Sequence, residues 1–305
     1  MTIRLPVFLA CLLPLALFAQ AWPKALLWTV VPPAGRDTSY LFGTMHSTDD
    51  RAFGQLVPVQ QVMTRCATVA GELDLQGQDN LALSLMGRLM LPADTELKDL
   101  YTRRQWKRLQ PALNDRLGPL SVMMGRMKPF FILATLMDGD MASDRERMLD
   151  DALLEHGREL GKRVIGLESV LEQMNALDAI PLNEQAELLY AHLLEPSEGE
   201  DLSTMHQAYA DQDLDRLWTL TNAASTGSLA FEKALITDRN RVMVQRMDSV
   251  ITIDSTALFL IGAAHLPGPD GLIMGLRALG YDVEPAEVKM NVSPADRPKR
   301  GPHLE

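Results

Sequence analysis

Four short apolar segments, each followed by a glycine and then an ionisable residue, constrain the fold of this chain more than any other feature. They span 39–46, 67–72, 163–168 and 257–265 and read SYLFGTMH, ATVAGE, RVIGLE and ALFLIGAAH. Short runs of β-branched, aromatic and aliphatic residues are typical of buried strands. The glycine permits a positive φ or a close approach of other backbone. Each predicted strand therefore presents a polar side chain just beyond its carboxyl end.

Helical patterns fill the sequence between these segments. Apolar residues recur at helical spacing within 106–113, 148–160 and 188–193. A further helix is predicted over 271–279, before a strand at 281–283. Strands that alternate with helices predict an α/β fold with a central, largely parallel sheet and flanking helices. Because ligands bind at the carboxyl ends of such strands, we expect the polar residues of the four segments to share one edge of the sheet.

Three further regions define the expected organisation around this sheet. Two stretches, about 76–160 and 172–250, exceed ordinary crossover helices, so we interpret them as long helical insertions that pack over the sheet as a lid would. The last residues, 291–305, contain three prolines and three basic side chains but almost no apolar residues. That composition predicts a disordered tail.

The first 21 residues have the pattern of a secretory signal. Arg4 precedes the apolar run 5–18, and the small-x-small triplet 19–21 forms a cleavage site. The run is short for a membrane span and contains two prolines, which argues against the alternative of an uncleaved anchor. We therefore expect a secreted or periplasmic protein, cleaved after Ala21, with no stable membrane span. The expected organisation is a signal peptide at 1–21, one α/β domain at 22–290 and the tail at 291–305.

Charge and cysteine content limit the partners and the chemistry. The chain carries 29 Lys and Arg residues against 40 Asp and Glu residues, a formal charge of −11. This acidic balance argues against nucleic acid as a partner, because nucleic-acid binding depends on clustered basic side chains. Of the two cysteines, Cys11 lies in the predicted signal peptide. Cys66 then has no disulfide partner, and we expect a small buried residue rather than a nucleophile.

Two of the six histidines occupy equivalent positions in the pattern. His46 and His265 each end a Gly-x-x-His unit that follows a predicted strand, whereas the other four lie on expected helices or in the tail. A metal ligand, general acid or general base needs a side chain held on a rigid strand end, and this arrangement supplies it. Coincidence also produces such pairs, so the pattern alone leaves the role of the two histidines open.

Two glutamates and one arginine complete the candidate site. Glu72 and Glu168 follow strand-ending glycines, where a buried carboxylate is costly unless it is paired or coordinates a cation. Arg239 lies on the apolar stripe of a predicted helix, so its guanidinium needs an anionic partner: Glu72, Glu168 or a substrate oxyanion. Two alternatives remain open. Glu168 also fits the role of an acid at a helix N-terminus, where the helix dipole stabilises its charge. Arg239 also fits the role of a partner in an ordinary interior ion pair.

Several familiar catalytic motifs are absent from the sequence. It contains no Gly-x-Ser-x-Gly elbow, no His-Glu-x-x-His helix and no Cys-x-x-Cys pair. The first absence argues against a standard α/β-hydrolase, and the second against the common zinc-protease helix. The candidate chemistry therefore depends on the residues that end the predicted strands.

Five blocks of sequence carry a family resemblance. They are 41–46, 71–74, 166–169 with 172–173, 239–240 and 261–272. In this order, over about 28–286, the chain resembles bacterial members of the TraB/GumN family, which is related to the Tiki metalloproteases and to the erythromycin-esterase-like and ChaN-like proteins. The last block, with the second Gly-x-x-His unit, is the most specific.

The resemblance implies a metal-dependent hydrolase fold. By position, His46, His265 and Glu72 would be ligands of a divalent metal (Mn, Co or Zn), since Tiki relatives use Mn²⁺ or Co²⁺. The two histidines would otherwise act as acid and base. Glu72 would be the catalytic glutamate, and Glu168 and Arg239 would complete the catalytic set. A divalent ion could lower the pKa of water and polarise a carbonyl, and Glu72 could then take the proton.

Two functions from different classes follow as hypotheses. The first is an exported metal-dependent hydrolase that cleaves a peptide or ester bond in a peptide or small-molecule substrate. The second is a non-catalytic periplasmic protein that binds a ligand or haem in the same pocket, because ChaN-like relatives bind haem. The sequence leaves the substrate, the metal and the oligomeric state open.

Overall fold

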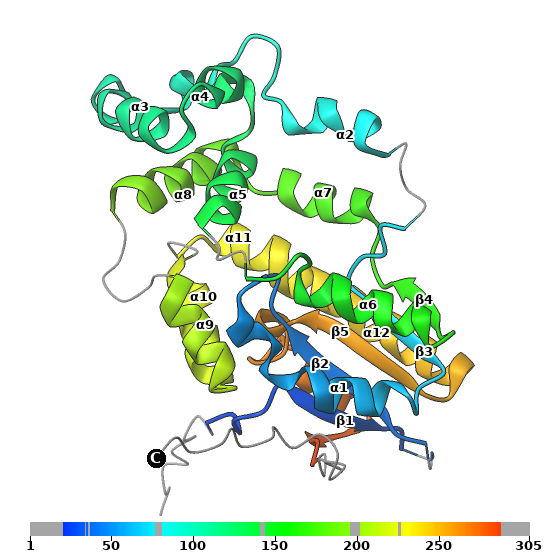
Figure 1. Cartoon of the computed structure of the whole chain (residues 1–305). Coiled ribbons are helices and arrows are strands. Elements are labelled where there is room, and N and C mark those ends of the chain that lie inside the picture. Colours follow the sequence, from blue (N-terminus) through cyan, green and yellow to red (C-terminus); the bar gives the residue numbers. More distant parts are fainter. Residues whose placement is uncertain are drawn as a thin grey trace, which may run out of the picture.

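The computed structural model describes residues 21–33, 35, 37–76, 81–140, 144–195, 202–224 and 227–287. The predicted tail, and the predicted signal peptide except Ala21, lie outside these residues. The described chain is an α/β fold in which a twisted sheet is flanked by helices and surmounted by a further helical layer (Figure 1).

A six-stranded sheet lies at the centre of the described chain, in the strand order β4-β3-β5-β2-β1-β6. Strands β4, β3, β5 and β2 are parallel, whereas β1 pairs antiparallel with both β2 and β6. The strands are β1 (Leu27–Val31), β2 (Ser39–Thr44), β3 (Thr68–Gly71), β4 (Arg163–Gly166), β5 (Ala257–Gly262) and β6 (Asp282–Pro285). The predicted largely parallel sheet is confirmed.

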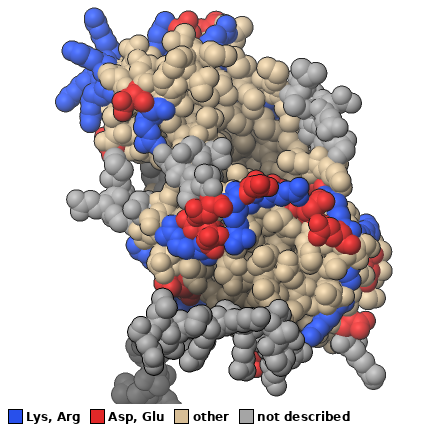
Figure 2. Space-filling view, viewed as in Figure 1, with Lys and Arg blue, Asp and Glu red and all other residues tan. Residues whose placement is uncertain are grey.

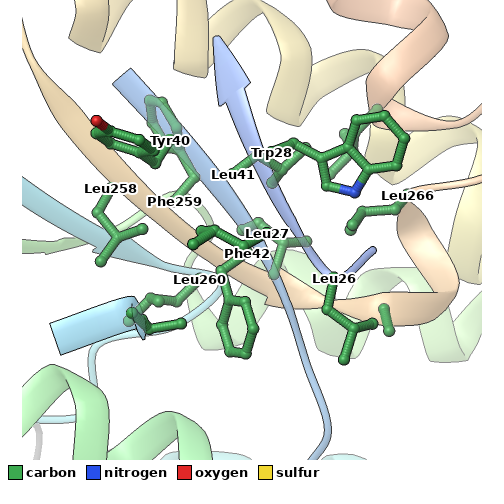
Figure 3. Close-up of a cluster of buried hydrophobic side chains, with 14 of the residues drawn as sticks. Leu26, Leu27, Trp28, Tyr40, Leu41, Phe42, Leu258, Phe259, Leu260 and Leu266 are labelled. Carbon is green, nitrogen blue, oxygen red and sulfur yellow. The ribbon is translucent and has the colours of Figure 1, made fainter. Parts of the chain in front are cut away.

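The central strands are apolar on both faces because helices cover both faces. Every residue of β2 is buried, and so is every residue of β5 except its last. Figure 3 shows Leu41, Phe42, Phe259 and Leu260 along these strands, with Trp28 on the neighbouring strand β1. Complete burial of each such side chain contributes about 1.5–3 kcal/mol. The sheet is therefore the rigid part of the molecule on which a site can be built.

The helices that connect the strands cover the sheet as right-handed crossovers require. Helices α1 (Leu56–Met63) and α6 (Leu149–Glu159) follow β2 and precede β4, and they lie on one face. Helices α12 (Asp238–Asp254) and α13 (Leu272–Ala278) flank β5 in sequence and lie on the opposite face, because the strand order reverses after β4. Ligands bind at such a reversal point in α/β sheets.

The two predicted helical insertions are confirmed. One lies between β3 and β4, and the other lies between β4 and β5. Much of them forms the layer above the sheet in Figure 1, with a core of its own that includes Leu109, Ile132 and Leu189. The helices of the insertions are α2 (Leu81–Leu89), α3 (Arg103–Leu117), α4 (Leu120–Met123), α5 (Pro129–Asp140), α7 (Val170–Asp178), α8 (Leu182–Leu194), α9 (Leu202–Ala210), α10 (Leu214–Ala224) and α11 (Leu229–Glu232). The short helical turns are η1 (Asp50–Gln55), η2 (Leu97–Leu100), η3 (Met124–Arg126), η4 (Lys233–Thr237) and η5 (Ala263–His265).

Cys66 is a free cysteine with a fully buried side chain, as the sequence predicts. Burial raises the pKa of its thiol to about 12, so the thiol stays protonated and unreactive at neutral pH. None of the helices in the described ranges has both the length and the apolar character needed to cross a bilayer.

Candidate functional site

The carboxyl ends of the four parallel strands lie side by side. In the ladders Thr44 pairs with Gly262, and Gly71 pairs with both Leu260 and Gly166. The four strands therefore end at nearly the same level of the sheet. The residues that follow them, which the sequence singles out, are thus brought to one edge.

Arg239 joins the two glutamates of the candidate site. Its Nη2 donates to Glu72 Oε2 at 2.5 Å and to Glu168 Oε2 at 2.6 Å, and its Nε donates to both oxygens of Glu168 at 3.1 Å. The side chains of Arg239 and Glu168 are 14% and 3% exposed. The structure thus pairs Arg239 with both of its predicted carboxylate partners. One guanidinium thus bridges two carboxylates in a largely buried site.

The π-helical turn η4 leads directly into α12, where Arg239 is the second residue. Arg239 Nη1 donates to the carbonyl oxygen of Leu235 in this turn at 3.2 Å, which fixes the guanidinium between the glutamates. Single π-helical turns are rare and are frequent at functional sites.

Glu72 is held by the backbone as well as by Arg239. Its Oε1 accepts a hydrogen bond from the N–H of Gly262 at 2.7 Å. A Cβ atom at Gly262 would lie 3.0 Å from the same oxygen, so the glycine lets the strand end approach the carboxylate. Burial raises the pKa of Glu72, but the Arg239 guanidinium and the Gly262 N–H outweigh burial and hold this pKa below its ordinary value. Glu72 is therefore ionised at neutral pH.

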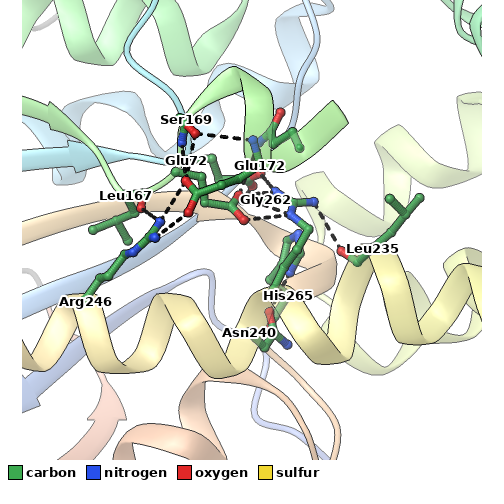
Figure 4. Close-up of polar contacts among 12 residues, drawn as sticks. Glu72, Leu167, Ser169, Glu172, Leu235, Asn240, Arg246, Gly262 and His265 are labelled. Carbon is green, nitrogen blue, oxygen red and sulfur yellow. Dashed lines mark hydrogen bonds and ion pairs between the residues drawn. The ribbon is translucent and has the colours of Figure 1, made fainter. Parts of the chain in front are cut away.

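His265 is buried in the short turn η5 that follows β5. Its Nδ1–H donates to Asn240 Oδ1 at 2.6 Å, and Asn240 Nδ2 donates to the carbonyl oxygen of Asp270 at 2.8 Å. Figure 4 shows Asn240 and Arg246 on α12, with His265 beside Asn240 and close to Glu72. Burial is the main reason that the pKa of His265 falls to about 4. His265 is thus neutral at pH 7, with Nε2 as its free lone pair.

His46 lies at the same sheet edge but outside this hydrogen-bonded cluster. Its side chain is 65% exposed, and its Nδ1 donates to Asp150 Oδ2 at 2.9 Å. This hydrogen bond is the main cause of a raised pKa at His46, to which the charge of Glu72 adds. The other oxygen of Asp150, Oδ1, is buried and makes no hydrogen bond to any described residue. His46 is therefore near enough for an electrostatic effect without touching the glutamates.

Helix α9 fixes the loop that carries His46. The hydroxyl of Tyr209 donates to the carbonyl oxygen of Gly43 at 2.7 Å. The hydroxyl of Ser47 donates to His206 Nε2 at 2.7 Å, and His206 Nδ1 donates to a backbone carbonyl of the same helix. His206 is 2% exposed. It supports the loop from inside the protein.

Sequence reasoning missed Asp150 and Asn240, the oxygen partners of the two histidines. Asp150 is an acid in the first turn of α6, a pattern shared with many helices that have no site. Asn240 follows Arg239 directly and belongs to the block that resembles the TraB/GumN family, which was the available signal. Neither residue has a pattern that indicates contact with a histidine far away in sequence.

The two histidines fit a divalent cation in their donor chemistry. Each engages an oxygen through Nδ1 and keeps Nε2 free, as metal-bound histidines usually do. Both oxygens of Glu72, however, already accept hydrogen bonds from Gly262 and Arg239. Across the part of the chain that the structure describes, no three His, Cys, Asp or Glu side chains are gathered into a group that could hold a metal ion. The set expected from the family resemblance, His46, His265 and Glu72, is thus not assembled into a metal centre.

The family model of the TraB/PrgY/gumN family matches residues 26–285, which is most of the chain. The chain belongs to the TraB/PrgY/gumN family. The predicted family is thereby confirmed, and the match covers every strand of the six-stranded sheet, from Leu27 to Pro285.

Curated relatives of this TraB/PrgY/gumN family chain carry protease names. It is 25% identical over 316 residues to metalloprotease TIKI2 of Danio rerio, covering 86% of this chain and 61% of the relative. It is 25% identical over 336 residues to metalloprotease TIKI2 of Xenopus tropicalis, and this match covers 92% of this chain and 63% of the relative. A metalloprotease TIKI homolog of Nematostella vectensis is 24% identical over 322 residues, and this match covers 86% of this chain and 67% of the relative. The chain thus spans less than two thirds of the length of the two TIKI2 proteins. No solved structure matches it.

Proposed function

We propose that the chain is an exported metal-dependent hydrolase of peptide bonds, with His46, Glu72, Glu168, Arg239 and His265 as its catalytic set. The observation that supports this most is the buried cluster of Glu72, Glu168 and Arg239 beside a neutral histidine. Buried charges of this kind at the strand ends of an α/β sheet are typical of functional sites. The protease names of the relatives supply the class of bond.

The environment of each site residue indicates a different chemical role in the proposed reaction. Glu72 is ionised and accepts the proton of the attacking water. Arg239 helps to hold the pKa of Glu72 below its ordinary value, and Glu168 fixes the guanidinium through hydrogen bonds. His46 is exposed and has a raised pKa, so it donates a proton to the leaving amine near neutral pH. A substrate group that draws Arg239 away from Glu72 raises the pKa of this carboxylate and makes it a stronger base.

A divalent cation is the cofactor that the relatives' names imply. His265 would offer Nε2 to it, since its Nδ1 is already hydrogen-bonded, and His46 would be a second ligand only where it does not serve as the proton donor. When bound, such a cation supplies Lewis-acid polarisation of a carbonyl and a lower pKa for water.

Cleavage of unstructured peptides tests the proposed activity. The full chain is incubated with a library of ten-residue peptides, and the products are identified by mass spectrometry. We expect cleavage that a chelator removes and that added Mn²⁺ or Co²⁺ restores. Absence of products under every metal condition would contradict the hydrolase. In that case a Soret band that appears on haem addition and is lost in His265→Ala would favour the haem-binding alternative.

Export is tested separately. The proposal of a signal peptide at 1–21 predicts that protein recovered from the periplasm or the medium begins at Trp22. N-terminal sequencing measures this directly, and an exported protein that still begins at Met1 would contradict cleavage.

A further inference from the structure

Strand β4 is the outer strand of the described sheet and pairs with β3. On β4 and just after it, the N–H groups of Arg163 and Leu167 donate to carbonyl oxygens of residues 67 and 71. Alternate residues of a strand face the same neighbour, so the N–H and C=O groups of Val164 and Gly166 face away from β3. They form an edge of backbone donors and acceptors that points out of the sheet.

The two edges of the sheet differ in how they are protected. The opposite edge strand, β6, contains Asp282, Glu284 and Pro285, and charges and proline discourage pairing with a further strand. Strand β4 contains one charged residue, Arg163, whose side chain is bound by Asp254 at the start of the strand. The rest of β4 is apolar or glycine. The edge of β4 therefore lacks the features that keep another strand away.

A pocket of about 430 Å³ lies directly beside this edge. Residues 165–169 form one wall, and Ser249 and Val250 of α12 form the other. The ion pair between Arg246 and Glu172 also lines it. Figure 4 shows Leu167, Ser169, Glu172 and Arg246 grouped next to Glu72. Because the wall includes Glu168, the pocket connects the open edge of β4 with the candidate site.

We propose that an extended segment of the peptide substrate docks on β4 as an additional strand. Its main chain bonds to the outward N–H and C=O groups of Val164 and Gly166, and alternate side chains enter the pocket between Ile165 and Val250. Addition of an extended peptide to an open sheet edge is a recurring mode of recognition, in which the main chain provides affinity and pockets provide specificity. The apolar walls favour an aliphatic side chain. This inference rests on the proposed peptidase function.

Val164→Pro tests the backbone part of the proposal. Proline lacks the outward N–H, and an edge strand tolerates proline where the N–H faces away from the neighbouring strand. We expect kcat/KM for cleavage of ten-residue peptides to fall about tenfold, mainly through KM, as the loss of one hydrogen bond implies. Val164→Ala keeps the N–H and is the matched control, with kcat/KM within about twofold of wild type.

Ser249→Trp tests the pocket without changing the strand. Ser249 is exposed on α12, so a larger side chain fills the pocket from outside the sheet. We expect the same loss of kcat/KM for peptides, whereas Ser249→Ala retains the wild-type value. Equal kcat/KM in wild type, Val164→Pro and Ser249→Trp would overturn the docking edge and leave the hydrolase intact.

A wild type that cleaves no peptide would instead contradict the proposed function. In that case docking is tested by measuring hydrogen exchange at the amides of the protein with and without the same peptide library. Slower exchange at the amides of Val164 and Gly166 supports the docking edge, and unchanged exchange at both overturns it.

Discussion

At the residue scale, Arg239 is the group on which the buried charges depend. It is hydrogen-bonded to Glu72 and Glu168, and its side chain is 14% exposed. Removal of one partner from a buried ion pair typically costs about 3–5 kcal/mol, because the remaining charge is left uncompensated. We therefore expect Arg239→Ala to lower the free energy of unfolding by about 3–5 kcal/mol in urea at pH 7. Arg241→Ala, at a side chain 66% exposed on the same helix, is the control and should change it by less than about 1 kcal/mol. Equal, small losses in both variants would contradict the role of Arg239.

The hydrogen bond between His46 and Asp150 predicts a pH dependence at the same scale. Asp150 raises the pKa of His46 above its ordinary value of 6.5. The stabilisation from this pair is therefore fully present below the unfolded pKa of His46 and is lost as the pH rises through the folded pKa. We expect Asp150→Asn to lower the pKa of His46 in an NMR titration of the imidazole ring. The same variant should destabilise the protein more at pH 5.5 than at pH 8.5, and an unchanged pKa of His46 would count against the pair.

At the scale of elements, glycines let the ends of neighbouring strands and turns come close together. A Cβ atom at Gly43 would lie 3.2 Å from the backbone of Ala263 and 3.1 Å from the side chain of Leu266. Overpacking of this kind typically costs about 1–3 kcal/mol. We expect Gly43→Ala to lower the free energy of unfolding by that amount, measured by urea denaturation. Gly54→Ala is the matched control, since no atom lies within 4 Å of its added Cβ. A Gly43→Ala variant as stable as the control would show that the two elements can separate without cost.

Much of this arrangement of elements is predictable from the sequence, and the part that is not has a physical reason. Strand-ending glycines and apolar runs predict β2 to β5 and the edge where Glu72, Glu168 and His265 lie. The pairing of Arg239 follows from its place on a buried helix face. The partners Asp150 and Asn240 do not follow, because they depend on how α6 and α12 are rotated and shifted against the sheet. Packing across the whole molecule decides these positions, and local sequence does not specify them.

At the scale of the whole molecule, two groups of buried residues support different parts of the structure. One surrounds the sheet, and the other lies among the helices of the upper layer. Leu109 is fully buried in the second group, so Leu109→Ala should cost about 2–5 kcal/mol. We expect hydrogen exchange to accelerate in α3, α5 and α8 and to stay slow in β2 and β5. Equal acceleration in the sheet would show that the two cores unfold as one unit.

The charge of the whole chain is negative, but its surface is mixed. Figure 2 shows acidic and basic side chains together in a band across the middle of this face. A separate group of basic side chains lies at the upper left of the same view. That nucleic acid is not a partner stays a prediction, consistent with the formal charge of −11.

The most direct test of the proposed site compares Glu72→Gln with Glu159→Gln. Glu159 is 65% exposed at the end of α6, so its variant makes the same chemical change away from the site. In the peptide-cleavage assay we expect kcat/KM of Glu72→Gln to fall by about 10²–10⁴-fold, the range for loss of a general base, and that of Glu159→Gln to match wild type. A folded Glu72→Gln protein that cleaves peptides as fast as wild type would contradict the central claim that this buried carboxylate carries the reaction.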